Sequence, residues 1–195
     1  VPVEVGRDYL SPDFASRLAL FADVVRQLDG EEGSFEERGR APGASSPMYL
    51  AQHRLFEQLP ELARDVRTPE YCSLARGEEL ARVNAWCGPA GTTTPLHCDP
   101  PHNLLCQALG RKYVRLYRPE AGALLDCPAV GMHANSSRVD LDFPLEALHA
   151  RWPALEKEPH WDGVLEPGDA LYVPPGWWHF VRSLTPSFSV SYWWE

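Results

Sequence analysis

Hydrophobic and polar residues alternate with a period of two in short segments of the second half of the chain, most clearly at residues 187–194. This alternation predicts short β-strands that each bury one face. Turn residues such as Gly110-Arg111 and Pro167-Gly168-Asp169 separate the segments, and Gly110-Arg111 would make the strands on its two sides a hairpin. The strands are expected at residues 82–88, 103–109, 112–117, on both sides of the turn within 163–173, at 180–184 and at 187–194.

The first thirty residues predict one strand and one helix. Residues 1–6 alternate and predict an edge strand. Ser11-Pro12 predicts a helix start, because Ser is a favoured N-cap and Pro fits the first turn. Apolar residues from Leu18 to Leu28 recur at helical spacing, and Gly30 would end the helix. We expect this helix to pack on the strands and to take no part in chemistry.

Shorter elements are expected in the rest of the N-terminal third. Residues 30–47 contain Gly, Glu, Ser, Arg and Pro with few apolar residues, which predicts a flexible loop. Residues 49–51 predict a strand, residues 55–59 a short helix, and a further helix begins at Pro60. Much later in the chain, residues 144–149 predict another short helix.

The number and length of these elements predict the fold class. About eight to ten short strands behind a helical cover indicate a mainly β, double-stranded β-helix of the jelly-roll or cupin type. The 19 prolines favour a barrel with many turns over a helical bundle. A chain of 195 residues suits one domain, with residues 1–80 as the cover and residues 81–195 as the core barrel.

Acidic residues outnumber basic ones, 27 to 18, which gives a net charge of −9 with neutral His. So acidic a chain is not expected to bind nucleic acid directly, because the phosphate backbone requires a basic patch. The charge favours a basic partner, such as a protein or peptide that bears Arg or Lys. The alternative is that the acidic surface only keeps the protein soluble.

Cysteine usage and hydropathy indicate the compartment. The five cysteines are an odd number without a C-x-x-C pair, so free thiols in a reducing compartment are expected. No signal peptide, transit peptide or long apolar run is present, so no membrane span is expected. The chain begins at Val1 without Met, as the catalytic part of a longer protein would.

The main chemical signal is the sequence His97-Cys98-Asp99. Side chains two positions apart on a strand point to the same face, so His97 and Asp99 could bind one metal ion while Cys98 points away. A third ligand would come from a distant strand, and His179 after a Pro-Pro-Gly corner is the candidate. Two His and one carboxylate, with other positions open, are the ligand set of non-haem Fe(II) oxygenases.

Other interpretations of this signal stay open at this point. A His-x-Asp match is common by chance, and a solvated strand end has the same pattern. Four further histidines are rival ligands, most of them in loop-like stretches: His102, His133, His149 and His160.

Several short motifs resemble the JmjC family of 2-oxoglutarate-dependent oxygenases. The resemblance covers nearly the whole chain and is greatest to a branch of small JmjC arginyl hydroxylases that are also named as lysine demethylases. The family motifs are matched by Pro95–Asp99, Asn103, Gly110–Tyr113, Glu166–Asp169 and Pro174–His179, and those of the branch by Pro2–Gly6, Tyr49–His53 and Ser187–Trp194.

The resemblance implies Fe(II) bound by His97, Asp99 and His179, with 2-oxoglutarate and O₂ as cosubstrates. 2-Oxoglutarate would be decarboxylated to succinate and CO₂ while a substrate carbon is hydroxylated. Lys112 would pair with the far carboxylate of 2-oxoglutarate, because a buried charge needs a partner. Its register with apolar strand residues would point it inward, but from the sequence alone a strand-edge charge would be favoured, and the resemblance reverses this.

Further cosubstrate contacts follow from the same resemblance. Tyr49 and Thr94 would offer hydroxyls to 2-oxoglutarate, and Asn103 would contact its C1 end. The branch usually has Ser in the position of Thr94, and both residues carry a hydroxyl. Trp193 would pack near the metal.

The expected activity is hydroxylation of an arginyl side chain, at C3, in a protein substrate. Glu4 would pair with the guanidinium and Trp86 would offer a flat aromatic surface. Glu4 could instead be a charged residue that keeps an edge strand from pairing with another chain, and Trp86 could be a core residue.

Two other functions are carried as alternatives. One is demethylation of histone Nε-methyl-lysine by the same chemistry, and the other is a cupin-type binding protein without turnover. Both the nucleus and the cytoplasm are compatible with the sequence, and the branch suggests a chromatin regulator in the nucleus. The sequence identifies neither the target protein nor the oligomeric state.

Overall fold

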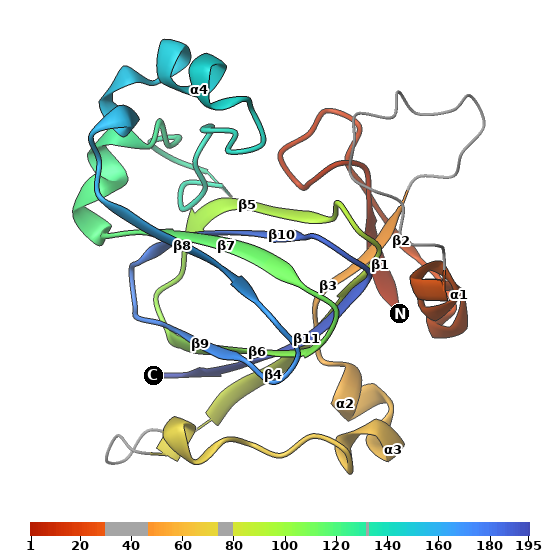
Figure 1. Cartoon of the computed structure of the whole chain (residues 1–195). Coiled ribbons are helices and arrows are strands. Elements are labelled where there is room, and N and C mark those ends of the chain that lie inside the picture. The colour runs from red at the N-terminus through yellow and green to blue at the C-terminus, as the bar shows by residue number, and fades with distance from the viewer. Residues whose placement is uncertain (30–46, 74–79, 132) are drawn as a thin grey trace.

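Two antiparallel sheets face each other as the walls of a barrel (Figure 1). The computed structural model describes residues 1–29, 47–73, 80–131 and 133–195. The architecture is mainly β and jelly-roll-like, as predicted. In spatial order, the larger sheet contains β2 (Ala15–Leu18), β1 (Pro2–Val5), β3 (Met48–His53), β4 (Leu80–Gly88), β11 (Ser187–Trp194), β6 (His102–Leu109) and β9 (Ala170–Val173). The smaller sheet contains β5 (Thr93–Cys98), β10 (Trp178–Ser183), β7 (Lys112–Tyr117) and β8 (His160–Leu165).

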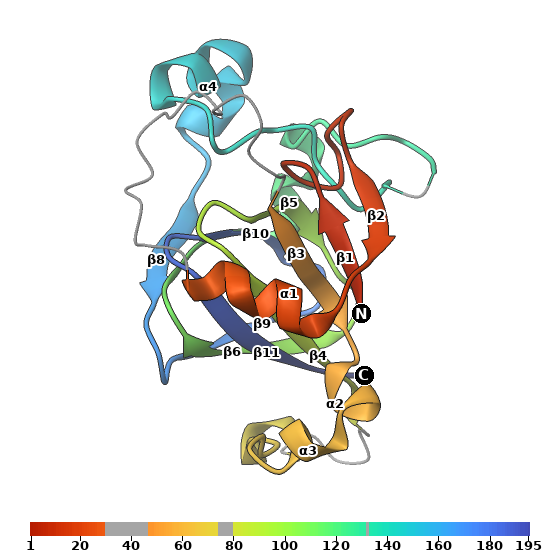
Figure 2. The same cartoon turned by 90° about the vertical axis from the view of Figure 1, so that its right-hand side faces the viewer.

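Short helices cover the outer faces of both sheets. On the larger sheet, Val24 packs with Leu50 and Cys87, so α1 lies across its outer face (Figure 2). On the smaller sheet, Leu148 and Trp152 pack on Phe180. Among the described residues, no helix has the length and apolarity needed to cross a membrane. The helices are α1 (Phe21–Arg26), η1 (Gln27–Asp29), α2 (Leu55–Gln58), α3 (Pro60–Ala63), η2 (Glu70–Ser73), η3 (Pro119–Leu124), α4 (Leu145–Arg151) and η4 (Pro153–Glu156).

The two sheets enclose an apolar layer on their inner faces. Val114 and Leu116 of β7 pack there with Leu105 of β6. Lys112 shares their face because side chains alternate along a strand, and it is 1% exposed. The predicted inward register of Lys112 is therefore what the structure shows.

The predicted hairpin at Gly110 is wrong. Its two strands form, but β6 pairs with β11 and β9 while β7 pairs with β10 and β8, so the turn connects the two sheets. Alternation specifies which face of a strand is buried and leaves its partner unspecified. Gly110 has φ +70°, and a Cβ there would lie 1.9 Å from the carbonyl oxygen of Pro186, so the crossing depends on glycine.

The predicted helix start at Ser11-Pro12 is also wrong. These residues lie in a turn, and Ala15–Leu18 pairs with β1 as the edge strand β2, so β1 is an inner strand. The helix α1 begins only at Phe21. The helical spacing was counted from Leu18, but Leu18 lies on the edge strand and its side chain is 84% exposed. The strands and short helices predicted for residues 49–63 and 144–149 are present, whereas the loop predicted at 30–47 lies, except for its last residue, outside the described residues.

All five cysteines are free thiols, as predicted. Burial raises the pKa of each thiol. Cys98 packs against the outer apolar cluster that contains Phe180.

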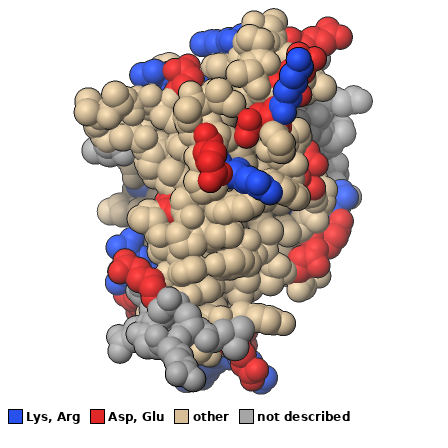
Figure 3. Space-filling model, turned by 90° about the vertical axis from the view of Figure 1, so that its left-hand side faces the viewer, with Lys and Arg blue, Asp and Glu red and all other residues tan. Residues whose placement is uncertain are grey.

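Charged side chains are sparse on the face of the molecule beside β8 and β9. Figure 3 shows that most of this face is uncharged, with charged groups mainly near its margins and one mixed cluster near its middle. No broad basic patch is visible on it, of the kind that nucleic-acid backbones require.

Candidate metal centre

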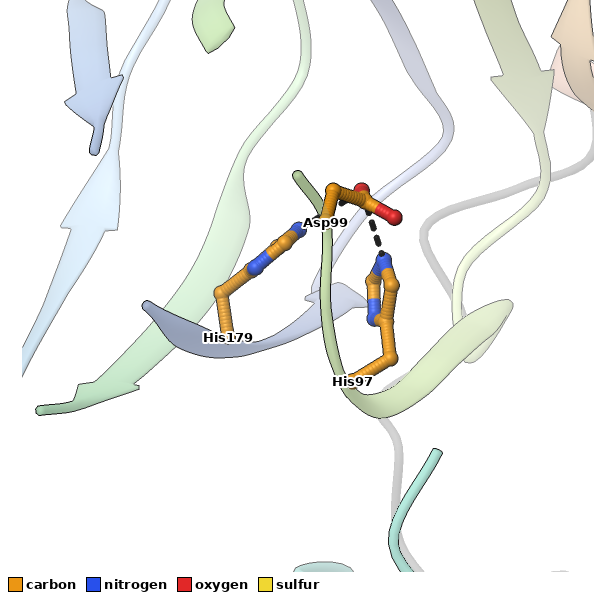
Figure 4. Close-up of side chains that lie close together, drawn as sticks. All are labelled: His97, Asp99 and His179. Atoms are coloured by element: carbon orange, nitrogen blue, oxygen red, sulfur yellow. Dashed lines mark ion pairs between the residues drawn. The ribbon is translucent and has the colours of Figure 1, made fainter. Parts of the chain in front are cut away.

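Three polar side chains converge where β5 and β10 lie side by side (Figure 4). His97 and His179 are register partners, and their ring centroids lie 4.1 Å apart. Oδ2 of Asp99 lies 3.4 Å from Nε2 of His97 and 3.7 Å from Nε2 of His179. One ligand atom from each residue falls within 4.8 Å of the others, which suits a shared metal ion.

The backbone determines which nitrogen each histidine offers. Nδ1 of His97 lies 2.8 Å from the carbonyl oxygen of Pro95, and Nδ1 of His179 lies 3.1 Å from that of Trp177. A carbonyl only accepts, so Nδ1 of each ring carries a proton, and in the neutral ring Nε2 keeps its lone pair for a metal. This pattern orients metal-binding imidazoles in proteins.

The charge state of the cluster fits a divalent cation. Burial and the charge of His97 lower the pKa of His179 to about 3, so this ring is neutral at pH 7. Burial by itself would raise the pKa of Asp99, but the hydrogen bond and charge of His97 lower it, so the carboxyl is ionised. A neutral imidazole beside a carboxylate, on a face with room for other ligands, is the donor chemistry expected of a non-haem Fe(II) site.

Asp99 lies just beyond the end of β5, and backbone contacts hold it there. Its carbonyl oxygen accepts a hydrogen bond from the Gly176 amide at 2.8 Å. On the other side of β5, Cys98 donates its amide to the carbonyl of Asn135 at 2.9 Å, and His97 is bridged to Ser136. The two ligands of the His-x-Asp motif therefore share a face although the strand ends between them.

A narrow cavity extends from the three ligands to Lys112. Lys112 is 1% exposed, and burial lowers the pKa of its amine to about 7. Its nearest polar partner is the Tyr49 hydroxyl at 3.5 Å, and in the described part of the chain it makes no ion pair. A buried cation without a counterion is costly, so this end of the cavity fits an acidic ligand.

Tyr49 and Thr94 lie at the Lys112 end of this cavity. Burial raises the pKa of the Tyr49 phenol strongly, and the hydrogen bond to Thr94 opposes that rise. Both hydroxyls therefore stay protonated and, with Lys112, can donate to a carboxylate. The structure thus brings Tyr49, Thr94 and Lys112 together in one cavity.

Asn103 and Trp193 lie opposite each other on β6 and β11 and line the same cavity. Oδ1 of Asn103 and Nε1 of Trp193 are buried, and neither has a hydrogen-bond partner among the described residues. Buried polar atoms are normally satisfied, so these two are available to a ligand or to ordered water. Ser191, which the sequence reasoning missed, lines the cavity beside them.

Glu4 and Trp86 lie on two sides of Tyr49. Glu4 is the register partner of Tyr49 on β1, and the rings of Trp86 and Tyr49 are 6.2 Å apart. Trp86 lines the cavity and donates its Nε1–H to Ser191 at 2.9 Å, whereas Glu4 lies outside the lining. Burial, followed by the charge of Asp8, raises the pKa of Glu4 to about 7.

The other histidines lie away from the three ligands. His102 stacks on Trp194 at 5.3 Å and contacts the Tyr172 hydroxyl at 2.7 Å, and His133 stacks on Tyr9 at 5.5 Å. The sequence reasoning also missed Tyr9, whose charge environment includes Asp99 and Glu4. No local pattern around Tyr9 indicates that position, whereas the Ser-x-Trp alternation of β11 could have indicated Ser191.

Comparisons with known proteins agree with this geometry. A family model described as a cupin-like domain matches residues 7–195. The chain is 46% identical to lysine-specific demethylase JMJ30 of Arabidopsis thaliana, 39% to Jumonji C domain-containing protein 5 of Drosophila melanogaster and 41% to lysine-specific demethylase 8 of Danio rerio. Each alignment covers 100% of this chain and respectively 42%, 47% and 45% of the relative. The chain thus spans less than half the length of these relatives.

Proposed function

Because the chain belongs to the cupin-like JmjC family of oxygenases and demethylases, we propose that it is an Fe(II)- and 2-oxoglutarate-dependent protein hydroxylase. The observation that supports this most is Lys112, a buried cation that has no counterion among the residues that the structure describes and that lies in the same cavity as the His-Asp-His cluster. The cluster alone would suit several divalent metals. The added cation calls for an acidic cosubstrate beside the metal.

Each residue of the site has a definite task in this proposal. His97, Asp99 and His179 would hold Fe(II) through Nε2, Oδ and Nε2. When bound, iron and 2-oxoglutarate supply the oxidising chemistry, with succinate and CO₂ as the products of the cosubstrate. Lys112 and Tyr49 would bind and orient the distal carboxylate.

The remaining residues of the cavity complete the cosubstrate site. Thr94 would add a hydroxyl donor at the distal carboxylate. Asn103 would contact the C1 end of 2-oxoglutarate, and Trp193 would pack beside it and exclude water. The buried, unpaired polar atoms of Asn103 and Trp193 support these roles.

The proposed prime substrate is an arginyl side chain, hydroxylated at C3, in a basic protein or peptide. Glu4 would pair with the guanidinium and Trp86 would pack on its plane. The acidic net charge of −9 supports a basic partner. Insertion of one oxygen atom into a C–H bond gives a stable alcohol and leaves the rest of the residue intact.

Demethylation of Nε-methyl-lysine is the second candidate, favoured by the names of two relatives, which are called lysine-specific demethylases. Hydroxylation of the N-methyl carbon would give a hemiaminal, which loses formaldehyde. A binding protein without turnover is the third, and the coexistence of all three ligands with Lys112 weighs against it.

Mass spectrometry of peptides incubated with the protein, Fe(II), ascorbate and 2-oxoglutarate separates these functions. We expect Arg peptides to gain the mass of one oxygen without formaldehyde, and the gain to be lost in His97→Ala. Loss of a methyl group with formaldehyde from methyl-lysine peptides would instead indicate the demethylase. Absence of succinate with every peptide, although metal and 2-oxoglutarate bind, would favour the binding protein.

A further inference from the structure

A second cavity lies on the other side of β5 from Lys112. This outer cavity has a volume of about 420 Å³ and lies between residues 7–12, the edge of β5 and residues 133–141. Thr93 and Pro95 of β5 line it, whereas Thr94 and His97 line the narrow cavity of the metal centre. Thr94 and His97 lie three residues apart, and the pairing of β5 with β10 shifts register between them, so β5 contributes side chains to both cavities.

A short segment connects the lining of the outer cavity with the strand of the metal ligands. Residues 135–137 run along the edge of β5: the Ser137 amide donates to the Leu96 carbonyl at 2.7 Å, and Ser136 is bridged to His97. Adjacent extended segments lie about 4.8 Å apart. The outer cavity thus begins one or two such spacings, about 5 to 10 Å, from the metal ligand His97.

Tyr9 contacts two residues that line the outer cavity. Its hydroxyl lies 3.0 Å from Oγ of Ser136, and its ring stacks on His133, both of which line the cavity. The charges of Asp99 and Glu4 also act on its hydroxyl.

The charged side chains that line the outer cavity are already paired. Arg7 lies 2.5 Å from Asp140 and 3.6 Å from Asp8, and Arg138 lies 3.2 Å from Asp126. Arg7 also lies 3.5 Å from Asp142, so a charged ligand would compete with existing ion pairs. The rest of the lining is largely apolar and includes Leu10, Pro12, Val139, Leu141 and Phe180.

We propose that the outer cavity binds an uncharged, apolar side chain of the protein substrate, two or three residues away from the side chain that enters the metal centre. An extended peptide advances about 3.3 Å per residue, so two or three residues span the separation between the cavities. Closeness to the metal centre and the lack of free charge are the two observations that identify this occupant. The inference rests on the proposed function, since it assigns a second recognition point to the same substrate.

A leucine scan of synthetic peptides tests this assignment. Each peptide has one central Arg in an Ala, Gly and Ser background, with a single Leu moved through the four positions on either side. Binding is measured by titration calorimetry with Mn(II) and 2-oxoglutarate, and hydroxylation of the same peptides by mass spectrometry. We expect Leu two or three residues from Arg, on one side only, to tighten binding about tenfold over the peptide without Leu.

Leu10→Asp and Leu18→Asp make a matched pair of variants for the scan. Leu10 lines the outer cavity and is 37% exposed, so a polar residue there should not prevent folding; Leu18 is 84% exposed on β2 and outside the lining. We expect Leu10→Asp to abolish the leucine preference and Leu18→Asp to retain it. Equal effects of Leu at all positions, a preference that survives Leu10→Asp, or no binding of any peptide would overturn the inference.

The two readouts separate this inference from the proposed function. A leucine preference in binding, lost in Leu10→Asp, without any hydroxylated Arg would support the outer cavity and contradict the hydroxylase. Hydroxylation of Arg at the same rate in all peptides, without a leucine preference in binding, would support the hydroxylase and contradict the proposed occupant of the outer cavity.

Discussion

Nζ of Lys112 lies 3.5 Å from the hydroxyl oxygen of Tyr49, and both side chains are buried. This pair is the polar end of a cavity whose other end is the His-Asp-His cluster. It explains why a lysine occupies an inward strand position between two sheets, where the neighbouring side chains are apolar. The cation is suited to a ligand and contributes nothing favourable to the ligand-free fold.

Replacing Lys112 with Met should separate cosubstrate binding from metal binding. Met has a similar volume without the charge, so the carboxylate of 2-oxoglutarate would lose its partner. We expect the KM for 2-oxoglutarate to rise about a hundredfold or more, since a buried charged hydrogen bond is lost, while bound metal stays unchanged. The KM is measured from succinate release at varied concentrations of 2-oxoglutarate. Bound metal is measured by metal analysis of the same samples. An unchanged KM would contradict the assignment of Lys112.

Lys112 should also make the stability of the ligand-free protein depend on pH. Burial lowers the pKa of its amine in the folded state to about 7, below the ordinary value of 10.5. Between these values the unfolded chain binds the extra proton, so the free energy of unfolding rises with pH by about 1.4 kcal/mol per unit. Below pH 7 the Lys112 amine is protonated in both the folded and the unfolded protein. The stability then no longer changes with pH through this group, and the gain reached at higher pH is lost. Urea unfolding at several pH values should show this rise relative to Lys112→Met; parallel profiles would contradict it.

Removing either ligand of the His-x-Asp motif should abolish metal-dependent turnover. His97→Ala or Asp99→Ala takes away one of three donors, and we expect turnover and metal affinity to fall by more than about a hundredfold, with circular dichroism unchanged. The matched control is His160→Ala, because His160 is exposed and outside the cluster. Metal content and succinate formation are the measurements. An active Asp99→Ala protein would rule out the three-residue metal site.

The affinity for basic peptides should increase with pH through Glu4. Burial raises the pKa of its carboxyl to about 7, so the group is mostly neutral at pH 6 and mostly ionised at pH 8. We expect the KM for an Arg peptide to fall about tenfold over this interval, as the fraction of carboxylate rises. Glu4→Gln should give a high KM that no longer varies in this way. If the KM of Glu4→Gln for the Arg peptide varied with pH as that of the wild-type protein does, Glu4 would be excluded from substrate binding.

The turn at Gly110 should tolerate no side chain. It combines φ +70° with a close approach to the carbonyl of Pro186, so Gly110→Ala should lower the free energy of unfolding by at least about 4 kcal/mol or prevent folding. Gly163→Ala is the control, because a Cβ there meets nothing within 4 Å, and its effect should stay within about 0.5 kcal/mol. The two variants are compared by their midpoints of thermal unfolding. Similar midpoints would mean that the turn at Gly110 between the two sheets can rearrange.

Local patterns identified the parts of this protein that depend on neighbours in sequence. Two-residue alternation identified most of the strands and the buried face of β7. The inward position of Lys112 was favoured over a strand-edge charge only through the family resemblance. The spacing of His97 and Asp99 indicated a shared ligand face. The distant third ligand, His179, was suggested by its motif, and the geometry now places it 3.7 Å from Asp99.

Only the tertiary structure decided what depends on partners far along the chain. The pairing of Ala15–Leu18 with β1 replaced a predicted helix, and the Gly110 turn connects two sheets where a hairpin was expected. Residues 135–137 joined the edge of β5 without any local strand signal. The physical reason is that a strand's alternation records which face is buried, whereas its hydrogen-bond partners are set by backbone groups from anywhere in the chain.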